Sequence, residues 1–142
     1  GPGDPEPAYR KMAPLLNQAL AHRLPTFGIC LGHQILALSL GARTVYMHHG
    51  HRGSNHPVLN LERDTVEISS QNHGFSVEEG SLPQGLKVTH RSLFDSSIEG
   101  FRSLEYPVFA VQYHPESSPG PHDSNYLFCD FVELMEKSSH VF

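Results

Sequence analysis

Cys30 lies between two glycines, in the run Gly28-Ile29-Cys30-Leu31-Gly32. A short apolar run, residues 25–29, precedes it and a helical run, residues 31–40, follows, so the thiol is expected at a sharp turn from strand to helix. This is the form of a nucleophile elbow with cysteine in place of serine, and the glycines permit the tight turn. The unpaired N–H groups at the start of a helix favour a thiolate. The segment predicts a nucleophilic thiol, with a buried core cysteine as the alternative interpretation.

A second chemical element, His114-Pro115-Glu116, follows the apolar run 107–113. A nucleophilic thiol needs a base that takes its proton and later returns one to the leaving group. The base in turn needs a carboxylate that fixes its tautomer. Histidine and glutamate side by side supply both groups, with a simple strand-ending turn as the alternative interpretation, and the functional interpretation gains weight from the elbow.

The elements that must position these groups begin with an amphipathic helix after Asp4 and Pro5, a pair suited to a helix N-terminus. Its apolar residues recur at helical spacing: Met12, Leu15, Leu16, Ala19 and Leu20. Pro14 predicts that the regular helix begins near it or is kinked there. After the elbow comes the helix over 31–40, which Gly41 closes.

Alternating runs at 65–68, 87–90, 98–102 and 107–113 predict four strands with short connections. Residues 42–60, rich in His, Gly, Asn and Pro, are expected to form a loop with a short strand at 44–47. A last helix should bury Leu127, Phe131, Leu134 and Met135, capped by Asp123 or Ser124. Together these elements predict an α/β fold, a central and partly parallel sheet flanked by helices, in a single domain over residues 1–142.

Composition excludes several classes of function. The formal charge of −5 comes without a Lys/Arg cluster, so no nucleic-acid partner is expected. No apolar stretch approaches the ~20 residues that span a bilayer, so no membrane role is expected either. Two cysteines, Cys30 and Cys129, do not make a disulfide framework, and both are interpreted as reduced thiols of a cytoplasmic protein, Cys129 as a packing residue.

Four histidines of the segment 42–60 suggest a metal cluster: His48, His49, His51 and His56. Cysteine or carboxylate companions at ligand spacing are lacking, so the sequence predicts a solvated loop and no metal site.

Four segments, taken in order, resemble the motifs of the class I (triad-type) glutamine amidotransferases. They are residues 1–5 (GPGDP), 28–34 (GICLGHQ), 71–75 (QNHGF) and 114–116 (HPE). Residues 72–75 and 115–123 look most like the branch that forms the small subunit of carbamoyl-phosphate synthase. The resemblance implies the flavodoxin-like fold of this family. It also implies that strands of the family's sheet precede residue 1, so that this chain is a part truncated at its N-terminus.

What the resemblance implies for catalysis concerns three residues. Cys30 would attack the side-chain amide of L-glutamine and form a glutamyl thioester, His114 would act as base and acid, and Glu116 would orient His114. Water would then release glutamate. The oxyanion donors would be the N–H groups of Leu31, next to the nucleophile, and Gly3.

The family's glutamine-binding positions fall here on Gly1, Gly3, Leu31, Gln34, Asn72, Gly74 and Phe75. Of these, Gln34 lies one helical turn after Cys30 and can face the same cleft. Without the family, Gly74 would be interpreted as a turn glycine and Phe75 as a core residue of a strand.

The resemblance also implies a partner. Ammonia would pass to a large synthetase subunit that makes carbamoyl phosphate for arginine and pyrimidine biosynthesis. No cofactor is expected in this chain, since it lacks a phosphate-binding glycine loop and ATP would be used by the partner. Three alternatives remain open: an amidotransferase serving another synthetase, such as those for anthranilate or GMP, a noncatalytic domain that only binds a partner, and a cysteine peptidase or esterase.

Overall fold

The computed structural model describes residues 4–114, 127 and 129–133, apart from the side chains of two residues of one strand. Its elements follow the order α1 (Glu6–Ala21), β1 (Thr26–Ile29), α2 (Leu31–Ser39), β2 (Thr44–Asn60), β3 (Thr65–Val77), the 3-10 turn η1 (Glu79–Ser81), β4 (Leu86–Ser92), β5 (Ile98–Ser103) and β6 (Val108–Val111). No helix in this part of the chain is long and apolar enough to cross a membrane.

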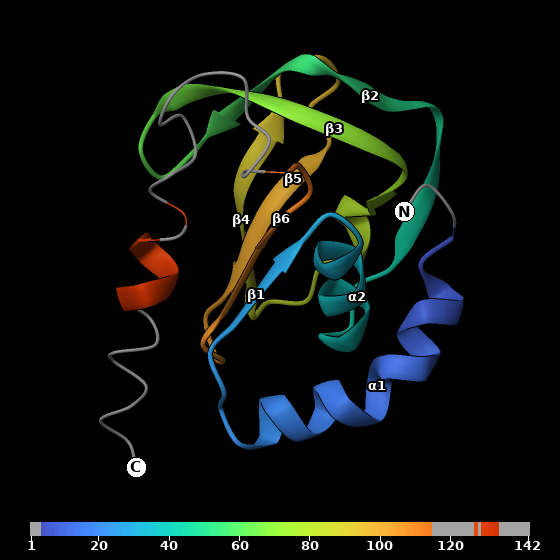
Figure 1. Cartoon of the computed structure of the whole chain (residues 1–142), viewed down its shortest axis with the longest axis vertical. Helices are drawn as coiled ribbons and strands as arrows, with labels where there is room; N and C mark the ends of the chain where they lie inside the picture. The colour runs from blue at the N-terminus through green and yellow to red at the C-terminus, as the bar shows by residue number, and fades with distance from the viewer. Residues whose placement is uncertain (1–3, 115–126, 128, 134–142) are drawn as a thin grey trace.

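The strands form one mixed sheet in the order β1-β6-β5-β4-β2-β3. Strands β1 and β6 run parallel, with Ile29 opposite Val111, and the other neighbours are antiparallel. Figure 1 shows the sheet between helix α2 on one side and the short helical segment near residue 130 on the other. The predicted α/β fold with a partly parallel sheet is confirmed.

Two apolar clusters fill the space on the two faces of the sheet. The larger joins α1 and α2 to the sheet through residues such as Leu20, Leu36 and Phe101. On the other face, Phe27 of β1 stacks on Phe109 of β6, with ring centroids 4.6 Å apart, and on Phe131, at 5.7 Å. Burial on both faces is typical of parallel strands and holds the β1–β6 pair in place.

Helix α1 begins as the sequence predicts. The Asp4 carboxylate accepts a hydrogen bond of 3.0 Å from the Glu6 N–H, and Pro14 lies inside the helix. The predicted apolar face is only half right, because Leu16 and Leu20 are buried while Leu15 is 64% exposed. Met12 is exposed as well. Helical spacing brings these residues near one another but does not fix which of them meets the sheet.

The prediction of a loop over 42–60 is wrong. This segment is the 17-residue strand β2, which pairs with β3 from Thr44 opposite Val77 to Asn60 opposite Thr65. Its register shifts twice, and the positive φ angles of Gly50 (55°) and Gly53 (134°) lie in this irregular part. The bulges break the alternation by which a strand is recognised in a sequence.

Near the C-terminus, residues 127 and 129–133 are helical and Leu127 is buried, in agreement with the predicted last helix. Cys129 is exposed, so its interpretation as a packing residue is wrong. Both cysteines are free thiols. The predicted caps Asp123 and Ser124 and the apolar residues Leu134 and Met135 lie outside the described residues.

Candidate active site

Cys30 occupies the single residue between the end of β1 and the start of α2. Its backbone has φ 54° and ψ −106°, a conformation that L-residues rarely adopt and that costs of order 1–3 kcal/mol. The Cys30 N–H donates a 2.9 Å hydrogen bond to the Val111 carbonyl at the end of β6. The strained turn predicted from the two glycines is therefore present and is tied to the neighbouring strand.

The two elbow glycines differ in what they do. A Cβ on Gly28 would lie 2.6 Å from Leu36 Cδ1 and 2.8 Å from the Gly32 carbonyl oxygen. Only glycine allows α2 to pack this closely against β1. A Cβ on Gly32 would meet nothing within 4 Å among the described residues. The close approach thus depends on Gly28, whereas the space beside Gly32 is open.

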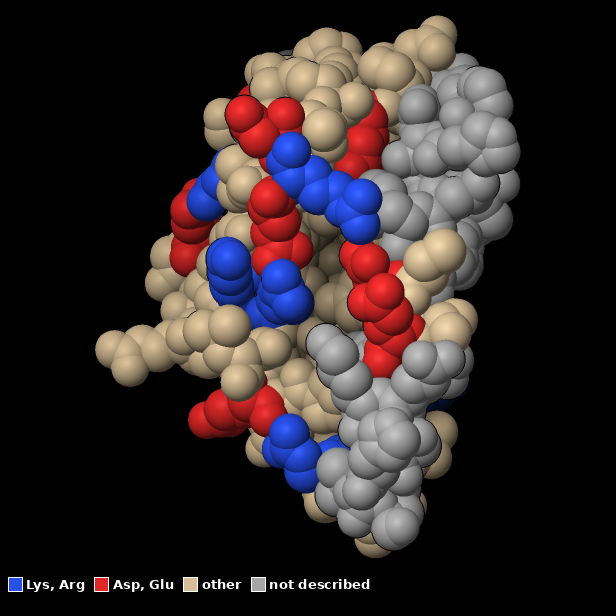
Figure 2. All heavy atoms as spheres, turned by 90° about the vertical axis from the view of Figure 1, so that its left-hand side faces the viewer, with Lys and Arg blue, Asp and Glu red and all other residues tan. Residues whose placement is uncertain are grey.

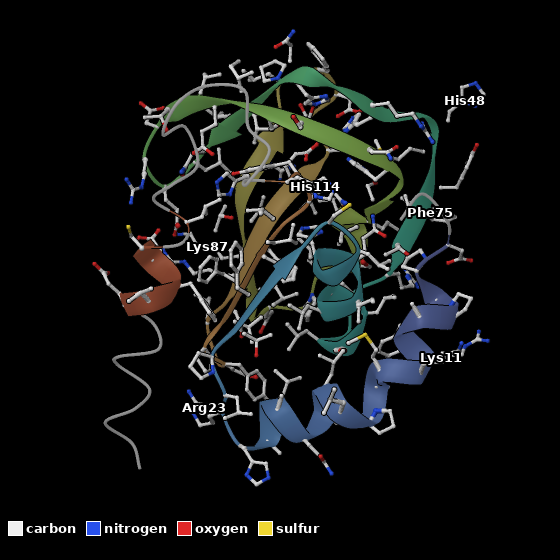
Figure 3. The ribbon with its side chains drawn as sticks, viewed as in Figure 1. Lys11, Arg23, His48, Phe75, Lys87 and His114 are labelled. Carbon is white, nitrogen blue, oxygen red and sulfur yellow. The ribbon has the colours of Figure 1, made fainter. Side chains whose placement is uncertain are left out.

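His114 follows β6 by three residues, and its N–H donates to the Ser70 carbonyl of β3 at 3.1 Å. Because β1 and β6 are parallel, Cys30 and His114 both leave the sheet at the same edge. Tyr113 anchors this exit, since its buried hydroxyl donates to Glu67 Oε1 at 2.8 Å. In the view of Figure 3, His114 lies at the end of the sheet where β1 turns into α2. Glu116, its predicted partner, lies outside the described residues.

Two polar groups lie near the Cys30 sulfur. The Gln112 side-chain amide donates to Sγ at 3.8 Å, and the Asn72 carbonyl oxygen lies 4.0 Å from Sγ. Asn72 belongs to the predicted set of glutamine-binding residues. Gln112 does not, because it lies within the apolar run 107–113 and no motif marks it. Its complete burial next to a strand end became visible only in the fold.

Gln34 connects helix α2 to the segment 72–75 of β3. Its amide Nε2 donates to the Phe75 carbonyl at 2.9 Å and to Gln112 Oε1 at 3.0 Å, and the side chain is 1% exposed. The structure therefore brings Cys30, Gln34, Asn72 and Phe75 together. Figure 3 shows Phe75 at the same end of the sheet as His114.

Of the remaining predicted binding residues, Leu31 is the first residue of α2, so its N–H has no acceptor within the helix. Gly74 is buried in β3 beside Phe75. Gly1 and Gly3 lie outside the described residues.

The predicted solvated histidine loop is also wrong in its burial. His51 and His56 are 5% and 6% exposed and lie inside, against Glu99 of β5, while His48 is exposed. The donor atoms of His51, His56 and Glu99 lie within 4.8 Å of one another, which is the chemistry of a metal site. However, His56 Nε2 is engaged by Ser92 Oγ at 2.7 Å, and His51 Nε2 by Asp95 Oδ2 at 2.7 Å. These groups form a hydrogen-bonded cluster.

The protonation of the buried histidines follows from their surroundings. Burial lowers the pKa of His33, on the buried side of α2, to about 3, and the nearby His73 acts in the same direction. Burial also lowers the pKa of His73 to about 4. Both rings are therefore neutral near pH 7. Of the histidines near Cys30, His114 is the one that follows directly from the strand next to the elbow.

A cavity of about 280 Å³ lies elsewhere, lined by Tyr106, Phe109, Leu127, Asp130 and neighbouring residues. None of the predicted catalytic or binding residues that the structure describes lines it. Figure 2 shows acidic and basic side chains mixed over one face of the molecule. Several are paired, as Arg102 with Glu62 and Arg63 with Asp130. We do not assign the active site to this cavity, because the residues suited to catalysis lie around Cys30.

An α/β sheet with a cysteine elbow at the carboxyl ends of its parallel strands is the architecture of a triad-type amidotransferase. Residues 1–134 match the family "Glutamine amidotransferase class-I". The chain belongs to this family.

The curated relatives of this chain define the branch. It is 58% identical over 137 residues to the carbamoyl phosphate synthase small chain of Ruegeria pomeroyi, covering 96% of this chain and 35% of that protein. It is 54% identical to the carbamoyl phosphate synthase small chain of Zymomonas mobilis, covering 96% of this chain and 37% of that protein. The chain thus spans about a third of the length of these relatives.

Solved structures agree on the fold. A protein from Thermoplasma acidophilum, assigned to GMP synthase as one of its subunits, superposes with a TM-score of 0.76 at 22% identity, covering 94% of this chain and 66% of that one. A glutamine amidotransferase from Thermotoga maritima superposes with a TM-score of 0.67 at 23% identity, covering 94% of this chain and 57% of that one. At this identity, the likeness concerns the fold alone.

Proposed function

We propose that this chain is part of a single glutamine amidotransferase domain that hydrolyses L-glutamine to glutamate and ammonia through Cys30. The observation that carries the proposal is the shared exit of Cys30 and His114 from the parallel strands β1 and β6. A thiol and an imidazole at one sheet edge are the two groups that amide hydrolysis through a thioester requires.

In the first half of the reaction, the Cys30 thiolate attacks the side-chain amide carbon of glutamine. The carbon–nitrogen bond breaks, and His114, protonated by the thiol, gives its proton to the leaving ammonia. In the second half, His114 takes a proton from water, which attacks the γ-glutamyl thioester and releases glutamate and the thiol. Glu116 orients the imidazole.

The negative oxygen that forms in both halves needs fixed donors. The Leu31 N–H, at the start of α2, is the first, and the Gly3 N–H is the second. The segment Asn72–Phe75 is held near the sulfur by Gln34, which suits it to bind the amino-acid end of glutamine, together with Gly1 and Gly74. The amide of Gln112, 3.8 Å from the sulfur, joins this set.

The ammonia is passed to a large synthetase subunit that makes carbamoyl phosphate, as the 52–58% identity to carbamoyl phosphate synthase small chains supports. ATP is used by that partner, in the synthesis that leads to arginine and pyrimidines. The alternative is a synthetase for GMP or anthranilate.

The test replaces Cys30 by Ser in the full-length protein in complex with its synthetase partner. Synthesis with glutamine should be lost, while synthesis with added ammonia should continue. Cys129→Ser, which alters the exposed thiol, is the matched control and should keep both activities. Normal glutamine hydrolysis by the Cys30→Ser enzyme would refute the proposal. A separate comparison of bicarbonate, xanthosine monophosphate and chorismate as co-substrates distinguishes the three synthetases.

A further inference from the structure

A buried cluster of charged and polar side chains lies partly within and partly behind the glutamine-binding segment, and the mechanism above assigns none of these side chains a role. It consists of His51 on β2, His73 on β3, Glu99 on β5 and Asp95 in the turn before β5. His73 and Glu99 are completely buried, and His51 is 5% exposed. Burying ionisable groups costs free energy unless they are paired, so the cluster requires an explanation.

The protonation of His51 follows from what its two nitrogens face. Nε2 lies 2.7 Å from Asp95 Oδ2, and Nδ1 lies 3.0 Å from Glu99 Oε2, a contact that is an ion pair by distance but lacks the alignment of a hydrogen bond. A ring between two carboxylates is stable when both nitrogens carry protons. Burial opposes this charge, yet Glu99 and Asp95 outweigh burial and raise the pKa of His51.

The two carboxylates differ in how their surroundings shift their pKa. Burial works to raise the pKa of Asp95, but the hydrogen bonds from Ser97 and His51 lower it to about 2, so it is ionised. Burial raises the pKa of Glu99, and the attraction of His51 works against that rise. His56, 3.9 Å from Glu99, has its pKa lowered to about 4 by burial and by the charge on His51. His51 is therefore the ring that lies between the Asp95 and Glu99 carboxylates.

The cluster continues to the glutamine-binding segment. His73 is neutral, and its Nδ1–H donates to the Phe75 carbonyl at 2.9 Å, because a carbonyl can only accept. His73 Nε2 lies 3.2 Å from His51 Nδ1 and 2.8 Å from Gln71 Oε1, which is itself 3.2 Å from His51 Nδ1. His51 therefore contacts the His73 ring directly, and Gln71 lies against both rings. The same Phe75 carbonyl accepts from Gln34, which also contacts Gln112.

We propose that His51, clamped as an imidazolium between Asp95 and Glu99, is a positioning residue for glutamine binding: it fixes the His73 ring, which holds the Phe75 carbonyl and thereby the segment Asn72–Phe75 beside Cys30. The inference rests on the proposed function. His51 touches neither substrate nor sulfur in this account and acts only through His73. Loss of the clamp should loosen the binding segment and weaken glutamine binding more than the chemical step.

The experiment measures kcat and KM for glutamine in the full-length protein in complex with its synthetase partner. His51→Ala should raise KM by about tenfold or more, the usual effect of losing a charged hydrogen bond, with kcat changed much less. Asp95→Asn, in an exposed turn, keeps the fold and should raise KM by about threefold to tenfold. Because both substitutions break the same clamp, the rise in KM of the double variant should be smaller than the product of the two single rises.

His90→Gln is the matched control, since His90 is an equally buried histidine of the same sheet whose partners are Thr89 and Glu67. It should leave KM for glutamine unchanged even if it lowers the melting temperature. Synthesis from added ammonia, which belongs to the partner, should stay normal in all variants. Cooperative unfolding and co-purification with the partner show that each variant folds and assembles.

Two results would overturn the inference. One is a wild-type KM in Asp95→Asn, or in a His51→Ala enzyme that unfolds cooperatively and co-purifies with the partner. The other is a loss of glutaminase activity on chelation that zinc restores, because the cluster would then be a metal site. A wild-type enzyme without glutaminase activity would instead refute the proposed function, so the two failures are distinct.

Discussion

Replacing Gly28 by Ala is predicted to damage both the stability and the chemistry of the elbow. The added methyl would lie 2.6 Å from Leu36 Cδ1 and 2.8 Å from the Gly32 carbonyl oxygen, while ordinary contacts are about 3.5 Å or longer. The Leu36 tip can turn away only within a packed core, since its side chain is 3% exposed. The Gly32 oxygen belongs to the first turn of α2 and cannot move alone. The start of α2 must therefore shift by roughly 0.5–1 Å.

Overpacking of this kind lowers the free energy of unfolding by about 1–3 kcal/mol. The shift carries Cys30 with it, and a displacement near 1 Å costs on the order of a hundredfold in rate. Gly28→Ala in the full-length protein should therefore unfold at lower urea concentration and hydrolyse glutamine at roughly 1–10% of the wild-type rate.

Gly32→Ala is the matched control for stability, because a Cβ there meets nothing within 4 Å among the described residues. It should change the free energy of unfolding by less than about 0.5 kcal/mol. Urea titration and ammonia release from glutamine measure the two effects. A Gly28→Ala protein with wild-type stability and activity would show that α2 does not depend on the close contact at Gly28.

Three further predictions concern the residues around the sheet edge. Glu116→Gln should slow glutamine hydrolysis less than His114→Asn, since orientation is worth less than proton transfer, and equal wild-type rates would remove both residues from the mechanism. Tyr113→Phe should cost about 1–3 kcal/mol in urea titration because it leaves the buried Glu67 carboxylate without its hydroxyl partner, and an unchanged midpoint would contradict this. Burial lowers the pKa of His90 from 6.5 to about 4, so only the unfolded chain takes up this proton as pH falls through that range. Stability should therefore fall from pH 6.5 toward 4, less steeply in His90→Gln, and parallel pH profiles of the two proteins would refute it.

The elbow could be predicted from the sequence because its signals are local. The glycines around Cys30, the apolar run before it and the helical spacing after it all lie within a few residues. The structure confirms strand β1 and helix α2 at those places, with Gly41 at φ 104° after the helix. The sequence did not show that Gly28 and Gly32 play different parts, since that difference depends on how α2 packs against β1.

Strand β2 and the buried cluster could not be predicted, because their pattern is not apolar. The inward side chains of β2 include His51, His56 and Asn60, polar residue types that are seldom fully buried. Their burial is explained by partners far along the chain, as with His51 and Asp95, which are 44 residues apart. Gln112 reaches Cys30 across 82 residues. Such pairs become visible only once the sheet order is known.

The central claim, that Cys30 is the nucleophile, is tested most directly by trapping the covalent intermediate. The full-length protein is mixed with glutamine labelled with ¹⁴C in its carbon chain, quenched in acid during turnover and digested, and the labelled peptide is sequenced by mass spectrometry. The account predicts a γ-glutamyl adduct on the peptide that contains Cys30, none on the peptide that contains Cys129, and loss of the adduct in Cys30→Ala. Label on another residue, or glutamine turnover by the Cys30→Ala protein, would contradict it.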